Sequence, residues 1–142
     1  MRLLVLSLAA ITGLSACAPI PNVHYFAPGI EGVVTRGADP VPGAEITVFG
    51  AFTKDTQTSL TGDDGRFHTD SVKEWRLIAK LFGDPIYAYT VEIRINGVKY
   101  NGYSFGLGIG YAPEKLQLSC DLTKPYKRMG GDYYCMPADG QY

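Results

Sequence analysis

The sequence has few of the side chains from which metal and hydrolytic centres are built. It contains two histidines, and neither His24 nor His68 lies at a metal-binding spacing from a cysteine or a carboxylate. No nucleophile motif surrounds the serines Ser59, Ser71, Ser104 and Ser119. We therefore predict no catalytic residues, no metal centre and no cofactor, and we expect that the protein is not an enzyme.

The sequence also lacks an excess of charge of one sign. Lysine and arginine number 13, and aspartate and glutamate number 14, which gives a formal net charge of −1 at pH 7. A domain that binds nucleic acid carries a basic excess, so we expect no nucleic-acid partner. No internal repeat and no low-complexity stretch is visible, and the length suits one domain with a single hydrophobic core.

Long hydrophobic runs are absent except near the N-terminus. Arg2 is followed by an apolar run from Leu3 to Leu14 and then by small residues. This run is shorter than the roughly 20 residues that a transmembrane helix needs, and its layout is typical of a secretory signal. We expect residues 1–16 to be a cleaved signal peptide.

The end of that run, Leu14-Ser15-Ala16-Cys17, resembles the lipobox of bacterial lipoproteins. In that family the cysteine is acylated by fatty acids such as palmitate and becomes the mature N-terminus. The resemblance implies lipidation of Cys17, and Ala18 in the sorting position implies a periplasm-facing protein anchored to the outer membrane. The alternative is a conventional signal peptide followed by an incidental cysteine. Each buried methylene contributes about 0.8 kcal/mol, so several acyl chains would hold the protein on a membrane.

Residues 17–28 contain three prolines and little periodicity. This composition predicts a lipidated N-terminus followed by a tether to the folded domain. Within it, His24-Tyr25-Phe26 could dock either on the domain or on a partner.

The stretch from Gly29 to Phe67 has the pattern of antiparallel strands. Two β-rich runs, 30–35 and 44–52, flank the turn Pro40-Val41-Pro42-Gly43. In the second run Ala44, Ile46 and Val48 share one face, which predicts a half-buried strand. A polar stretch and the turn-forming residues 61–65 follow, and then 66–69 resumes an extended pattern.

Three parts of this stretch carry a resemblance to a known family. Gly32-Val33, then Pro42-Gly43-Ala44-Glu45-Ile46-Thr47-Val48, then Thr61-Gly62-Asp63-Asp64-Gly65-Arg66-Phe67 are similar to the carboxypeptidase regulatory-like domains. That resemblance implies a transthyretin-like (prealbumin-like) β-sandwich. Transthyretin-like enzymes that hydrolyse 5-hydroxyisourate end in Tyr-Arg-Gly-Ser, and the different ending here argues against that activity.

The second half of the chain continues in strands. Asn96-Gly97 joins the β-rich runs 85–95 and 98–105, which is the strongest short-range hairpin signal. Residues 73–82 fit a strand from Trp75 to Leu81, with a short helix as the alternative. The remaining features are a predicted bend or loop, not a nucleotide-binding loop, at 106–110 and a last strand at 115–122. Together these predict an all-β, Greek-key-like sandwich of about seven strands over residues 29–122.

The tail, residues 123–142, has no periodic element. With Cys17 occupied by lipid, an exported chain is expected to pair its other two cysteines, Cys120 and Cys135. The alternative is two free thiols or a metal-binding pair. The expected disulfide would staple the tail to the last strand.

Two groups of residues are candidates for binding. Asp63 and Asp64 are weak calcium candidates, because a full site needs more oxygen ligands, and their turn role alone explains them. Tyrosine is favoured at recognition surfaces, which makes a candidate interaction surface of Tyr87, Tyr89, Tyr100 and Tyr103. The alternative for the tyrosines is ordinary cross-strand pairing.

These features predict a membrane-anchored, non-catalytic binding or structural module for an envelope protein or component. A more specific version is a subunit of an envelope assembly, as in the transthyretin-like lipoproteins of the type VI secretion apparatus. The competing class is a calcium-dependent carbohydrate binder or an envelope enzyme that uses the Asp63–Gly65 turn and nearby tyrosines.

Overall fold

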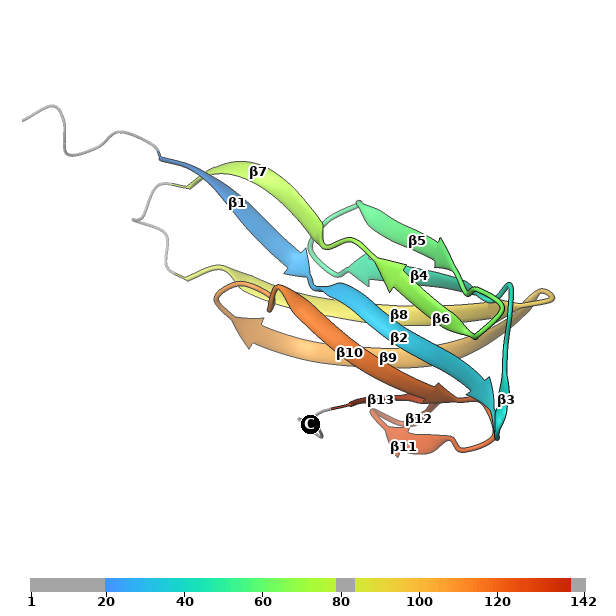
Figure 1. The fold of residues 1–142 in the computed structure, drawn as a ribbon. Helices are drawn as coiled ribbons and strands as arrows, with labels where there is room; N and C mark the ends of the chain where they lie inside the picture. The colour runs from blue at the N-terminus through green and yellow to red at the C-terminus, as the bar shows by residue number, and fades with distance from the viewer. Residues whose placement is uncertain (1–19, 79–83, 139–142) are drawn as a thin grey trace, which may run out of the picture.

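The structure is a computed structural model that describes residues 20–78 and 84–138 (Figure 1). All regular secondary structure in these residues is β-strand. The strands are β1 (Ile20–Ala27), β2 (Gly29–Arg36), β3 (Asp39–Pro40), β4 (Glu45–Gly50), β5 (Thr56–Leu60), β6 (Arg66–Thr69), β7 (Val72–Ile78), β8 (Ile86–Ile95), β9 (Val98–Ile109), β10 (Lys115–Asp121), β11 (Tyr126–Arg128), β12 (Gly131–Tyr133) and β13 (Cys135–Pro137). The prediction of an all-β fold is confirmed.

One layer of the sandwich is a four-stranded antiparallel sheet with the order β5-β4-β8-β9. Its inner face follows from the alternation in β4, because Ile46 pairs with Ile93 and Val48 pairs with Val91, and all four side chains are buried. The turn between β8 and β9 confirms the Asn-Gly prediction: Asn96 and Gly97 both have positive φ, 48° and 80°.

The other layer is a five-stranded sheet with the order β13-β10-β2-β3, in which β6 also pairs with β2. The pairing of β10 with β2 is parallel and joins segments far apart in the chain, with Leu116 opposite Ile30 and Cys120 opposite Val34. Figure 1 shows this sheet stacked on the four-stranded one. The buried core between the layers is Phe26, Ala27, Ile30, Val34, Ala44, Ile46, Val48, Phe67, Val72, Tyr89, Val91, Ile93, Tyr103, Leu118, Cys120, Leu122 and Cys135.

The seven strands that the sequence predicts correspond to β2, β4, β6, β7, β8, β9 and β10. The structure adds β5 where the sequence predicts only a polar stretch. β5 lies at the sheet edge and alternates between exposed and half-buried residues, so it has no apolar periodicity to detect. The tail also differs from the prediction, because it forms the three-residue strands β11, β12 and β13.

The predicted tether over residues 17–28 is corrected by strand β1. From Ile20 onward this segment pairs with β7, and its inner end packs into the core, where Phe26 and Ala27 are buried. We call the β1–β7 pair the arm; it extends the β2–β6 pair beyond the sandwich (Figure 1). Prolines hide this strand in the sequence, yet a two-stranded arm tolerates them because each strand has a free edge.

The ambiguous segment 73–82 is a strand as far as Ile78, in agreement with the preferred prediction, and its last residues lie outside the described part. The predicted bend at 106–110 is wrong over most of its length, because β9 continues to Ile109. Gly108 pairs with Tyr87, and a Cβ on Gly108 would lie 2.3 Å from the Tyr87 ring. Glycine is therefore needed here for the close approach of an aromatic ring, not for a turn.

Candidate functional site

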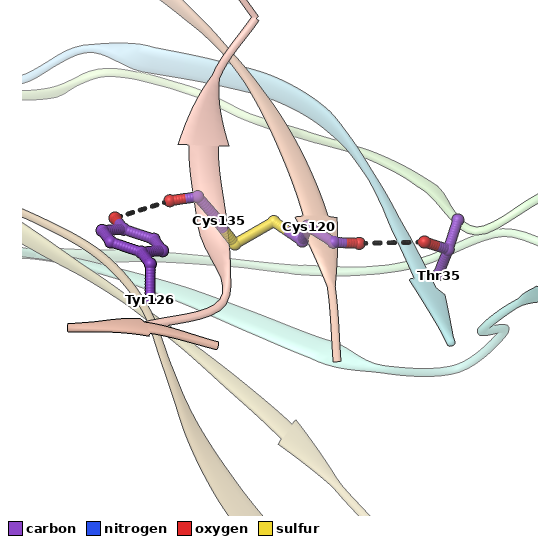
Figure 2. Close-up of a disulfide and its surroundings, with 4 residues drawn as sticks. All are labelled: Thr35, Cys120, Tyr126 and Cys135. Carbon is purple, nitrogen blue, oxygen red and sulfur yellow. Dashed lines mark hydrogen bonds between the residues drawn. A yellow bond between two sulfur atoms is a disulfide. The ribbon is translucent and has the colours of Figure 1, made fainter. Parts of the chain in front are cut away.

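The predicted disulfide between Cys120 and Cys135 is present (Figure 2). The two cysteines are opposite each other in the antiparallel β10–β13 pair, and both are buried. Two hydrogen bonds flank the bridge: the Tyr126 hydroxyl donates to the Cys135 carbonyl oxygen at 2.8 Å, and the Thr35 hydroxyl donates to the Cys120 carbonyl oxygen at 3.2 Å. The bridge thus ties the tail to the last strand of the sandwich, and through it to β2.

Next to the disulfide, the Asp121 carboxylate joins two turns. It accepts hydrogen bonds from the Gly37 N–H at 3.0 Å, from the Thr123 N–H at 3.0 Å and from the Thr123 hydroxyl at 2.7 Å. The Lys124 ammonium lies 3.4 Å from its other carboxylate oxygen. These hydrogen bonds, the Thr123 hydroxyl first, hold the pKa of Asp121 well below its usual range. The carboxylate therefore stays ionised at any ordinary pH.

This network gives a pH-dependent prediction for Asp121→Ala. Because folding lowers the pKa of Asp121, the carboxylate stabilises the fold above its unfolded pKa of about 3.9, and this contribution is lost as the pH falls further. We expect the variant to have a lower melting temperature than the parent at pH 7, and the gap to narrow below about pH 4. Melting curves from pH 2 to pH 8 measure this. Asp39→Ala, an exposed carboxylate near Gly37, is the control, and an equal loss in both variants would contradict the prediction.

In the Asp63–Asp64 turn, the Asp64 carboxylate already contacts groups of its own turn. The Asp64 carboxylate accepts a hydrogen bond from the Arg66 N–H at 3.0 Å and lies 3.5 Å from the Arg66 guanidinium. In residues 20–78 and 84–138, no group of three or more His, Cys, Asp or Glu side chains is arranged to hold a metal ion. Both aspartates are exposed, as is His68 on β6, which lies 3.7 Å from Asp70.

The four candidate tyrosines lie on the inner face of the four-stranded sheet. Tyr89 and Tyr103 are each only 3% exposed and belong to the core, and Tyr87 and Tyr100 are half-buried against it. Burial raises the pKa of the Tyr89 hydroxyl far above its ordinary value. The interaction surface predicted from these tyrosines is corrected, because Tyr89 and Tyr103 serve the cross-strand packing that the alternative described.

The aromatic rings continue as a stack toward the end of the sheet. Phe105 lies between Tyr87 and Tyr89, with ring centroids 5.2 Å and 5.6 Å away. At the other end of the stack, the Arg128 guanidinium from β11 lies 5.3 Å from the centroid of the Tyr103 ring. This contact seats the tail on β9, and the tyrosines therefore hold the tail and the core together.

A hollow with a volume of about 660 Å³ lies on the outer face of the five-stranded sheet. We call it the groove. It is shallow and lined by residues of β2, β6 and β10, the end of β5 and the end of the tail: Glu31, Gly32, Val33, Ser59, Leu60, Arg66, Phe67, His68, Gln117, Leu118, Ser119 and Ala138. Sequence reasoning missed the groove because its walls come from segments that only the parallel β2–β10 pairing brings together.

Charge is unevenly spread along the groove. Glu31 stands near one end, where its carboxylate is 3.8 Å from the His68 ring and 3.7 Å from the Lys115 ammonium. All three side chains are well exposed, so these pairs stabilise the fold little and remain open to exchange with a ligand. The rest of the lining combines Arg66, serine and glutamine side chains with apolar residues. The groove is suited to hydrogen bonding with an extended polar segment.

Comparisons with known proteins found no relative. No protein-family model matches the chain, and neither a curated protein nor a solved structure matches it. In the described residues, no helix is long and apolar enough to span a membrane. The predicted lipidation residue, Cys17, lies outside the described part of the chain.

Proposed function

We propose that this protein is a lipoprotein of the cell envelope that works as a non-catalytic binding module. In this proposal, the lipid on Cys17 is inserted in the outer membrane and anchors the protein there. The β-sandwich then presents the groove to a protein partner in the periplasm. The observation that carries the proposal is the sequence Leu14-Ser15-Ala16-Cys17 after an apolar run, three residues before strand β1 begins at Ile20.

The structure supports the binding role through the groove. Its floor is a sheet face that belongs to the core on its other side, so the lining is rigid, and Glu31, Arg66, His68, Gln117 and Ser119 add charged and polar side chains to its apolar residues. Its open, shallow form suits a protein segment better than a small molecule, because small-molecule sites enclose most of their ligand. A subunit of a secretion-type envelope assembly is the more specific version of this proposal.

The lipid anchor is tested by Cys17→Ser. We expect the variant to lose fatty acid, as measured by mass spectrometry of the intact protein, and to move from the membrane fraction to the soluble fraction. Ala18→Asp is the matched control: in the lipoprotein family this position sets sorting, so the variant should keep its fatty acid and leave the outer membrane. A parent protein without fatty acid would contradict the anchor.

The groove is tested by placing a photo-crosslinking amino acid at Ser119, an exposed groove residue on β10. We expect irradiation of cells to link Ser119 to one envelope protein, independently of calcium. The same probe at Thr90, exposed on the outer face of the four-stranded sheet, should give no such product. A calcium-dependent glycan ligand with no protein product would instead favour the carbohydrate-binding alternative.

A further inference from the structure

Among the described residues, several large apolar side chains near one end of the molecule are exposed, and four of them carry this argument. They are Trp75 on β7, Ile86 at the start of β8, and Leu107 and Ile109 at the end of β9. Trp75 is 76% exposed and Ile109 is 77% exposed. Exposed large apolar side chains at one end of a molecule are typical of an interaction surface.

The ends of β8 and β9, which carry Ile86, Leu107 and Ile109, are fixed next to each other. Ile86 and Ile109 are cross-strand partners, and the Gly110 N–H donates to the Pro85 carbonyl oxygen at 2.6 Å beyond them. The arm is joined to the same end, because the Ala112 N–H donates to the Tyr25 carbonyl oxygen at 3.2 Å, and Trp75 is opposite Val23. Figure 1 shows the start of β1 and β8 and the end of β7 and β9 at this end.

The chain itself points to the occupant of this end. Cys17 precedes Ile20 by three residues, and three fully extended residues reach no more than about 11 Å. Trp75 is opposite Val23, only three strand residues further along, or about 10 Å at the rise of a β-strand. A lipid on Cys17 therefore keeps this end of the molecule within reach of the bilayer surface at all times.

We propose that the end formed by Trp75, Ile86, Leu107 and Ile109 rests on the lipid bilayer. This inference depends on the lipid anchor proposed above and adds a fixed orientation to it. Tryptophan is enriched at membrane interfaces, where its ring lies among the headgroups, and isoleucine and leucine bury apolar area in the layer beneath. The sandwich then stands on this end, and the groove stays open to the periplasm.

The opposite end of the sandwich has a different character. It carries ion pairs, among them Arg66 with Asp64 at 3.5 Å and Arg94 with Glu45 at 3.8 Å. It also exposes Leu60, which is 64% exposed and so closely matches Leu107 at 63%. These two leucines provide a matched pair of positions at the two ends of one molecule.

The experiment uses the single tryptophan of the chain as its probe. The full lipidated protein is reconstituted into vesicles of phosphatidylethanolamine and phosphatidylglycerol, with or without brominated acyl chains, which quench tryptophan that touches them. We expect Trp75 emission to shift to the blue in vesicles and to be quenched by the brominated lipid. With Trp75→Phe as background, we expect Leu107→Trp to be quenched and Leu60→Trp to be unaffected.

Four outcomes would overturn the inference. Protein that floats with the vesicles while Trp75 keeps a water-like, unquenched emission would overturn it and leave the anchor intact. Equal quenching at positions 60 and 107 would show that the molecule has no fixed orientation. Protein without fatty acid that does not float would overturn the anchor, and with it this inference. An unquenched Trp75 that becomes shielded as protein concentration rises would assign this end to a second copy of the chain.

Discussion

Removal of the disulfide with Cys120→Ala and Cys135→Ala together is expected to lower the free energy of unfolding by about 3 kcal/mol. The two cysteines are 15 residues apart, and a loop of that size restricts the unfolded chain by about this amount. Both side chains are also buried, so the substitutions leave small gaps in the core. Urea unfolding of parent and variant, followed by circular dichroism, measures the difference.

The same change should act locally on the tail. Strand β13 has only three paired residues, so without the bridge its hydrogen bonds open readily. We expect fast hydrogen exchange in β13 for the double variant and for the parent treated with a reductant. Reductant should have no effect on the double variant, which serves as the control. A double variant with the urea midpoint of the oxidised parent would show that the bridge does not stabilise the fold.

Gly65→Ala is expected to cost about 3 kcal/mol of stability. Gly65 has a φ of 73°, a conformation that costs an L-residue roughly 1–2 kcal/mol, and a Cβ there would lie 2.4 Å from the Val34 carbonyl oxygen. That oxygen belongs to the backbone of a central strand, so relief requires a shift of β2, at a further cost of about 1–3 kcal/mol. Urea unfolding of the purified variant checks this value.

Gly43→Ala separates the conformational cost of positive φ from the steric cost of the contact with Val34. Gly43 has nearly the same φ, 68°, but a Cβ there would meet no atom within 4 Å. This variant should therefore show only the conformational cost of about 1–2 kcal/mol. Equal losses in Gly43→Ala and Gly65→Ala would mean that the close approach to Val34 contributes nothing.

The parts of the fold that the sequence predicts are those determined by neighbouring residues. Alternation in 44–48 places Ile46 and Val48 inside, and Asn96-Gly97 determines a hairpin, because both signals act over a few residues. The disulfide is expected from the cysteine count together with the predicted export of the chain. Strand β1 and the groove could not be predicted in this way, since each depends on a partner strand far along the chain.

The tyrosines show why composition predicted the wrong surface. Tyrosine is common at recognition surfaces, but it is equally suited to a half-polar sheet interior. Only the register shows that Tyr89 is opposite Phe105 and Tyr103 opposite Val91 on the inner face. The apolar end formed by Trp75, Ile86, Leu107 and Ile109 also could not be predicted from the sequence, because three separate strands supply its residues.

The parallel pairing of β2 with β10 sets the order in which the protein can fold. β10 begins at Lys115, so most of the chain must be made before β2 acquires this neighbour. Pairing over so long a separation is slow, because the chain must close a large loop before any contact rewards it. Until then one edge of β2 stays open to other strands, so the newly made protein is most at risk of aggregation just before its last fifth arrives.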